Sequence, residues 1–258
     1  MTCSPPSAAA FPPRTPDLDR LTFYLLKNLN RAVHEFAMIA DGDRVAVAVS
    51  GGKDSGALLH LLAARQRTVA ERTEIVALHV QMDSFGLTDM RPALEPWFAQ
   101  LGVEYAFVRP ELPAGELLPL DCQRCAWHRR KALLLKAHAL GCNKLALAHH
   151  ADDAAETTLL SLLYSGRLET LAPRREYFDG AITLIRPLIY VEERRLVQLA
   201  RALRSAVLFG QMPPDRSACP RAGVSQRAWV KRWLAEAGPD LRQIRANLWR
   251  AARRHEGF

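Results

Sequence analysis

The sequence predicts an α/β fold, a parallel sheet with helices on both faces, with helical additions at both ends of the chain. Short β-branched segments alternate with segments of helical periodicity, and such connections place parallel strands side by side. The clearest unit is a strand over 44–49 that runs through a glycine turn into a helix over 56–64. The 258 residues suffice for one such domain and are too few for several large ones.

The other elements follow from the spacing of apolar residues. Apolar residues recur at helical spacing from Leu18 to Ile39, which predicts an amphipathic helix packed on the body of the protein. Further strands are predicted over 75–82, 103–108, 144–148 and 182–185, and further helices over 91–101, 122–140, 152–164, 192–204, 225–237 and 241–254.

Composition divides the chain into four parts. Residues 1–16 are rich in Pro, Ala and Ser and are expected to be a disordered tail. A helical segment over 17–40 precedes the α/β domain over 41–205, and residues 206–258 combine a loop with basic helices. No run approaches the roughly 18 apolar residues of a membrane span, and no signal-peptide pattern is present. We therefore expect a cytoplasmic protein that makes no membrane contact.

The charge balance points to a polyanionic partner. Lys and Arg number 35 against 27 Asp and Glu, an excess of eight positive charges. Much of the excess falls after residue 190, and arginine predominates there. Guanidinium groups suit bidentate contacts with phosphates and stacking on bases. Nucleic acid is therefore a candidate partner, although a merely basic protein has the same balance.

A glycine-rich string follows the first predicted strand. It reads Ser50-Gly51-Gly52-Lys53-Asp54-Ser55 and leads into a helix. Glycines let the backbone approach phosphate oxygens, and the helix start adds free N–H groups and the positive end of its dipole. Lys53 adds a positive charge, and Asp54 is suited to hold Mg²⁺ on the phosphates. The spacing is neither Walker A nor the dinucleotide fingerprint. The string instead resembles the signature of PP-loop ATP pyrophosphatases, and this resemblance implies that the domain over 41–205 binds ATP.

The rest of the nucleotide site is expected where neighbouring strands end. The second strand contains His79 near its end, and backbone groups there are placed to meet the adenine edge. The fourth strand leads into His149, His150, Asp152 and Asp153. Adjacent side chains of a strand face opposite ways, which disfavours a His149/His150 metal pair. Instead, the histidines and Asp152 are predicted to flank phosphate or Mg²⁺, and Asp152 and Asp153 to cap the next helix.

Cysteine usage argues against a disulfide framework. The chain has five cysteines and no export signal. Cys122 and Cys125 lie one helical turn apart near a predicted helix start. Such a pair fits half a zinc site, a redox dithiol or ligands of an iron–sulfur cluster. Cys142 is expected in the core, and Cys3 in the tail has no expected role.

A third cysteine narrows these choices. Cys219 lies in a Pro- and Gly-rich stretch, from which its thiolate can join the pair Cys122 and Cys125. Three cysteines suit a [4Fe–4S] cluster with one open iron. Structural zinc takes a fourth protein ligand, for which His128 or His138 is available.

In this order, the motifs resemble the TtcA family, the tRNA 2-thiocytidine biosynthesis proteins of the PP-loop ATP pyrophosphatase superfamily. The likeness spans about residues 21–252. The segments that carry it are Ser50–Ser55, Cys122 and Cys125 followed by Arg129-Arg130, His149–Asp153, Tyr164–Leu168, Ile185–Leu188 and Cys219.

The resemblance implies an ATP-dependent transferase that adenylates the C2 oxygen of cytidine 32 in tRNA and replaces it with sulfur, releasing pyrophosphate and AMP. It implies ATP, Mg²⁺ and a [4Fe–4S] cluster as cofactors, a cysteine desulfurase as sulfur donor, and a homodimer. Carried over by position, Cys122, Cys125 and Cys219 are the cluster ligands. We accordingly predict Lys53, Asp54 and Asp152 as catalytic residues, and predict that ATP is bound by Ser50, Gly51, Gly52, Lys53, Asp54, Ser55, His79 and His149.

The segment around Cys219 departs from the family pattern, in which two cysteines stand in a compact Pro-Cys-x-x-Cys-Gly-Ser-Gln stretch. Here a single cysteine and one extra residue precede Ser225-Gln226. A sulfurtransferase for another tRNA nucleotide or a small molecule therefore remains an alternative. The three cysteines disfavour a lysidine-forming ligase, which shares the PP-loop. Intact Lys53, Asp54 and Asp152 disfavour a non-catalytic RNA-binding paralogue.

Overall fold

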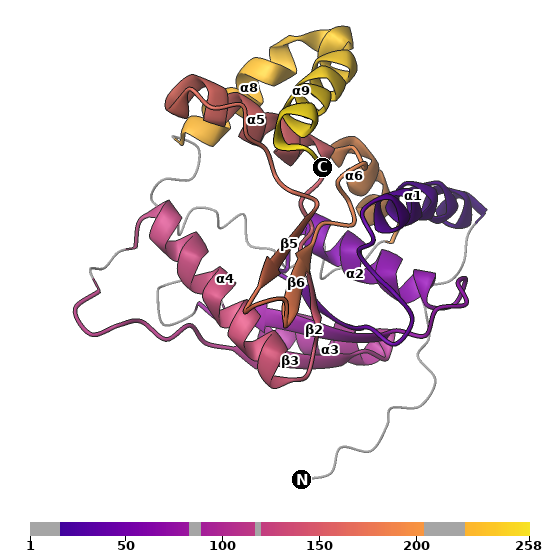
Figure 1. The fold of residues 1–258 in the computed structure, drawn as a ribbon. Helices are drawn as coiled ribbons and strands as arrows, with labels where there is room; N and C mark the ends of the chain where they lie inside the picture. The colour runs from indigo at the N-terminus through magenta and orange to yellow at the C-terminus, as the bar shows by residue number, and fades with distance from the viewer. Residues whose placement is uncertain (1–15, 83–88, 117–119, 204–224) are drawn as a thin grey trace.

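A six-stranded sheet forms the centre of the protein. The structure is a computed structural model that describes residues 16–82, 89–116, 120–203 and 225–258. The strands lie in the order β3-β2-β1-β4-β6-β5, and all pair in parallel except β5, which is antiparallel to β6 (Figure 1). Their bounds are β1 Arg44–Ala48, β2 Glu74–Val80, β3 Glu104–Val108, β4 Lys144–Ala146, β5 Arg174–Tyr177 and β6 Ile182–Ile185.

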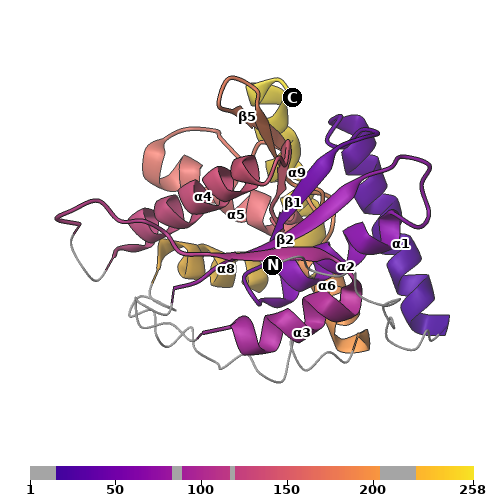
Figure 2. The ribbon, with the colours of Figure 1, turned by 90° about the horizontal axis from the view of Figure 1, so that it is seen from below.

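Helices cover both faces of this sheet. Figure 2 shows α4 on one side of the sheet and α3 and α6 on the other. The helices are α1 Pro16–Glu35, α2 Lys53–Arg65, α3 Arg91–Leu101, α4 Cys122–Ala139, α5 Ala151–Ser165, α6 Glu193–Ala202, α8 Gln226–Glu236 and α9 Leu241–Glu256. A short 3₁₀ helix, Gly238–Asp240, joins the last two.

The alternation of side chains along β1 shows why the middle of this strand is apolar on both faces. Val45 and Val47 belong to the core formed with α1, α2, α3 and α6, whereas Ala46 belongs to the core under α4. Successive strand side chains face opposite sides, and because helices cover both faces of the sheet, Val45, Ala46 and Val47 are all buried. The glycine loop follows β1 and leads into α2, which places it at the carboxyl edge of the sheet.

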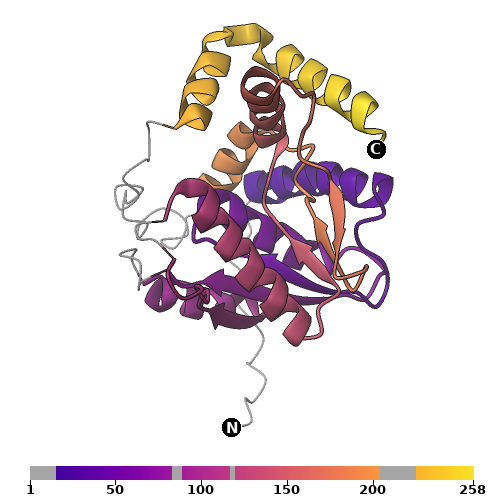
Figure 3. The same ribbon diagram turned by 60° about the vertical axis from the view of Figure 1, so that its left-hand side comes forward.

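The C-terminal helices form a smaller layer on α5. Val230 and Leu234 of α8 pack with Leu159 of α5 in a cluster of their own. Figures 1 and 3 show α8 and α9 beside α5, at the end of the molecule away from the centre of the sheet. No helix in the described ranges combines the length and apolar character needed to cross a membrane.

The predicted fold class is confirmed, with one strand that the sequence analysis missed. β5 carries the polar sequence Arg-Arg-Glu-Tyr, and its first three residues are exposed. An edge strand is covered on no more than one face, so it needs no continuous apolar run. Such runs were the signal that predicted the other strands. Phe178 and Asp179 have positive φ before Gly180, which makes the hairpin turn to β6. The predicted tail lies almost wholly outside the described residues.

The docking of α1 on the core is testable with two substitutions on one helix. Leu29 is fully buried, whereas the side chain of Phe23 is 65% exposed. We expect Leu29→Ala to lower the free energy of unfolding by about 2–5 kcal/mol, because it removes buried methyl groups and leaves a cavity. Phe23→Ala is expected to change it by less than about 0.5 kcal/mol. Urea denaturation followed by circular dichroism measures both, and equal losses would contradict the placement of α1.

Candidate nucleotide and metal site

The glycine loop is shaped by its own serines. The Ser50 N–H donates to Ser55 Oγ at 3.1 Å, and the Gly52 N–H donates to Ser50 Oγ at 3.3 Å. Gly51 has φ +83°, and a Cβ there would lie 2.8 Å from the Met90 side chain. The end of the Met90 side chain could move aside, so it is the positive φ that favours glycine at this turn. No side chain in the described residues caps α2, so its first N–H groups remain available to an anion.

A cavity of about 320 Å³ opens beside this loop. That volume lies within the range of small-molecule pockets. The loop, α4 and the start of α5 contribute its polar lining, and the strand ends and α4 its apolar lining. The polar lining residues are Ser50, Asp54, Ser55, Arg129, Arg130, His149 and Asp153. The cavity lies at the carboxyl ends of parallel strands, where open α/β sheets bind ligands.

An ionic cluster borders the cavity. Lys53 Nζ lies 2.9 Å from Asp54 Oδ2 and 2.9 Å from Glu193 Oε1. Lys231 of α8 reaches the same Glu193 carboxylate, with its Nζ 2.7 and 2.9 Å from the two oxygens. Two lysines from distant parts of the sequence therefore share one carboxylate next to the phosphate loop.

The charges of this cluster reinforce one another. Burial lowers the pKa of Lys53, but the hydrogen bonds and charges of Asp54 and Glu193 outweigh it and raise that pKa. Burial likewise raises the pKa of Glu193, but the two lysines lower it to about 2. Both groups are consequently ionised at neutral pH.

Asp54, His150 and Glu193 form a candidate cation position. Their potential ligand atoms all lie within 4.8 Å of one another. Asp54 Oδ1 is buried and has no hydrogen-bond partner among the described residues. Carboxylate oxygens are the ligands that Mg²⁺ prefers. Sequence reasoning missed Glu193. The only sequence signal for it was its position as an acidic residue at the start of the helix that follows β6.

Asp152 takes a supporting position. Its carboxylate accepts the Glu193 N–H at 2.9 Å and pairs with Arg245 of α9. The predicted cap of α5 is confirmed for Asp153, which takes part in a capping box, and is wrong for Asp152. His150 is the N-cap, its Nδ1 accepting from the Asp153 N–H at 3.4 Å while the Asp153 carboxylate accepts from the His150 N–H at 3.0 Å. Asp152 instead joins the starts of α5 and α6.

The two predicted histidines differ in placement. His149 lines the cavity, and its Nδ1 accepts from Arg186 Nε at 3.2 Å. Burial first, and then the Arg186 charge, lower the pKa of His149 to about 3. His79 Nδ1 lies 2.8 Å from the Val49 carbonyl oxygen, so His79 supports the backbone at the end of β1. Its direct contact with nucleotide remains a prediction.

The structure describes Cys122, Cys125 and Cys142. Cys122 is the first residue of α4 and Cys125 lies one turn later, its free thiol half-buried. His128 follows on the same helix, fully buried, with no hydrogen-bond partner among the described residues, although Glu116 Oε2 lies 3.2 Å from its Nε2. Cys142 is buried in the core, as predicted. Cys219 lies outside the described residues, so the predicted triad remains a prediction.

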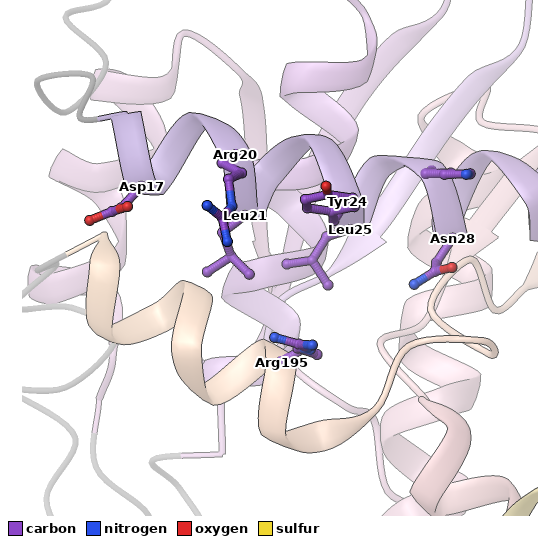
Figure 4. A pocket seen from close by; sticks show the side chains of 8 residues that line it. Asp17, Arg20, Leu21, Tyr24, Leu25, Asn28 and Arg195 are labelled. Atoms are coloured by element: carbon purple, nitrogen blue, oxygen red, sulfur yellow. The ribbon is translucent and has the colours of Figure 1, made fainter. Parts of the chain in front are cut away.

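A second cavity lies away from these residues. It has about 590 Å³ and lies between α1 and Arg195 of α6. Leu21 and Leu25 point from α1 toward α6, and Arg195 points back from α6 (Figure 4). None of the predicted site residues lines it, so we assign it no role in the nucleotide site.

The phosphate loop, the sheet edge and the bordering cavity define a protein of the PP-loop class. The sequence profile of the PP-loop domain matches residues 25–207. The chain is 37% identical over 243 residues to the tRNA-cytidine(32) 2-sulfurtransferase of Geobacter sulfurreducens, with 91% of each chain covered. It is 36% identical to that of an Anaeromyxobacter species, with 91% of this chain and 77% of the relative covered. The chain belongs to the tRNA-cytidine(32) 2-sulfurtransferase family.

A solved structure supports the fold alone. The U34-tRNA thiolase NcsA from Methanococcus maripaludis, determined with its [4Fe–4S] cluster, superimposes with a TM-score of 0.73. The alignment covers 92% of this chain and 80% of the thiolase at 20% sequence identity. The α/β architecture and its helical additions therefore have a counterpart in a known structure.

The neutral state of His149 is open to NMR titration. We expect its ring to stay unprotonated from pH 8 to 5, because its pKa is about 3. The unfolded chain protonates this residue near pH 6.5, so this group's contribution to stability falls as the pH drops from about 6.5 to 3. Arg186→Gln should raise the pKa of His149 yet leave it below 6.5, since burial remains. A His149→Asn variant assigns the signal, and titration near pH 6.5 in the unsubstituted protein would contradict this account.

Proposed function

We propose that this protein is an ATP-dependent tRNA-cytidine(32) 2-sulfurtransferase. One observation carries the proposal. In a chain of this family, an intact phosphate loop that contains Lys53 and Asp54 lies beside a cavity. The relatives are named for the sulfur transfer to cytidine 32. The late departure around Cys219 keeps thiolation of another tRNA nucleotide as the second candidate.

ATP binding is assigned to the carboxyl edge of the sheet. The loop over 50–55 surrounds the phosphates with N–H and hydroxyl donors, and Lys53 supplies a positive charge. Asp54 and Glu193 provide the oxygen ligands for Mg²⁺. His149, neutral and fixed by Arg186, offers a hydrogen-bond donor at Nε2 in the cavity. Asp152 acts as a positioning residue, since it orients the start of α6 and thus Glu193.

The chemistry replaces a poor leaving group by a good one. The C2 oxygen of cytidine attacks the α-phosphorus of ATP, the bond to the bridging oxygen breaks, and pyrophosphate leaves. A sulfur nucleophile then adds at C2, and the C2–oxygen bond breaks with AMP as the leaving group. Lys53 and the loop N–H groups stabilise the negative charge that develops on pyrophosphate, as preorganised donors do.

The iron–sulfur cluster is assigned to the start of α4. The helix places Cys122 and Cys125 one turn apart, Cys125 is half-buried and unpaired, and the buried His128 lies one turn further along. Cys122 and Cys125 fit two ligands of a [4Fe–4S] cluster, and Cys219 is the proposed third. When bound, the cluster would hold and pass on the sulfur that a donor protein delivers.

The partners follow from the same assignment. We propose tRNA as the substrate, a cysteine desulfurase as the source of sulfur, and a cytoplasmic homodimer as the working form. The family membership supports tRNA, and the resemblance in the cysteine segments supports the sulfur donor. Anaerobic incubation of the protein with ATP, sulfide and unmodified tRNA, followed by mass spectrometry of the nucleosides, tests the activity. Formation of 2-thiocytidine at position 32 supports the first candidate, whereas a thiolated uridine supports the second.

Lys53 is the first residue to substitute. Lys53→Ala should weaken ATP binding at least about tenfold, because a charge-assisted hydrogen bond is worth about 1.5–3 kcal/mol. Thiolation should fall with it. Isothermal titration with Mg·ATP provides the measurement, and Lys27→Ala on the exposed side of α1 is the matched control for charge. Unchanged ATP affinity in Lys53→Ala would exclude the assigned phosphate site.

The cluster assignment is tested with single cysteine substitutions. Cys125→Ala and Cys219→Ala should each lose the iron–sulfur absorbance and bound iron after anaerobic purification, because each removes a ligand. Cys142→Ala should retain both, since Cys142 lies in the core. A colourless unsubstituted protein that contains zinc would remove the cluster and leave the ATP site standing.

A further inference from the structure

The carboxylate of Glu193 holds two lysines next to the phosphate loop. Glu193 is the first residue of α6, Lys53 the first of α2, and Lys231 lies in the middle of α8. Both ammonium nitrogens lie 2.9 Å from the same oxygen, Glu193 Oε1. They are therefore separated by at most twice that distance, which adjacent phosphate groups of one nucleotide can span.

We propose that Lys231 is a second phosphate-binding cation of the nucleotide site, kept in place by Glu193 until ATP arrives. The proposal rests on the proposed binding of ATP and extends it to a residue of the C-terminal helices. Phosphates carry several negative charges, so they compete with a single carboxylate for both lysines. Lys53 and Lys231 would then face the phosphates from α2 and α8.

The position of α8 does not depend on Lys231. Val230 and Leu234 anchor the helix in the apolar cluster on α5. Arg227, one turn before Lys231, contacts Glu156 Oε2 at 3.2 Å and Thr157 Oγ1 at 3.0 Å. Lys231 itself has a side chain that is 49% exposed, and such ion pairs add little to stability. Its ammonium group is thus available to change partners while the helix stays in place.

The location of Lys231 selects the part of the nucleotide that it contacts. Lys53 stands at the N-terminus of α2, where the phosphates are expected. Lys231 meets the same carboxylate as Lys53 and is not among the residues that line the cavity. The structure therefore assigns Lys231 to the phosphates that leave as pyrophosphate, not to base or ribose. AMP lacks those phosphates and should be insensitive to Lys231.

The test compares ATP, pyrophosphate and AMP by isothermal titration in the presence of Mg²⁺. We expect Lys231→Ala to weaken ATP and pyrophosphate about tenfold or more and to leave AMP within about twofold. Lys231→Arg should restore most of the affinity, because it keeps the charge. Arg232→Ala, which removes one charge from the next position of the same helix, is the control and should leave all three affinities unchanged.

Three outcomes oppose the inference. Unchanged ATP affinity in Lys231→Ala would show that Lys231 does not contact phosphate. An equal loss for ATP and AMP, with a lower melting temperature, would show that Lys231 only ties α8 to α6. Absence of ATP binding in the unsubstituted protein would overturn the proposed function itself, and this result is distinct from the other two.

Discussion

The carboxylate of Glu193 connects the parts of the site that the chain brings from far apart. It bonds Lys53 at the start of α2 and Lys231 on α8, while its own backbone N–H is held by Asp152 at the start of α5. Four helices therefore meet around one side chain. The carboxylate is half-buried and ionised, so it depends on nearby cations to compensate its charge.

The parallel sheet makes that meeting possible. The carboxyl ends of β1, β4 and β6 lie at one edge, and the segments that follow them begin α2, α5 and eventually α6. Helix starts carry free N–H groups and the positive end of the dipole. Three such starts gathered at one edge favour anions there, and this is the edge to which the phosphates of ATP are assigned.

The sequence predicted the elements and the phosphate loop well, because these depend on local spacing. The loop Ser50–Ser55 is contiguous, and its glycines have one clear physical use. Glu193 and Lys231 were beyond such reasoning, since their meeting depends on how α6 and α8 pack. The edge strand β5 was missed because it is polar. Little of it is buried, so it needs no apolar pattern. The role of Asp152 also required geometry, because Arg245 comes from a helix ninety-three positions later.

The packing also changes the meaning of the basic C-terminal region. In the sequence, its lysines and arginines pointed to a polyanionic partner. In the structure, Arg227, Lys231 and Arg245 pair with acids of α5 and α6 that border the nucleotide site.

Much of this positive charge is therefore already compensated within the protein. Arg250 and Arg254 of α9 are exposed and make no ion pair with a described carboxylate. Net charge measures the total of such groups, whereas an RNA surface needs those that remain uncompensated. Contact with RNA in this region thus depends on fewer arginines than the sequence suggests. It also depends on whether RNA phosphates displace the carboxylates that now pair with the other basic side chains.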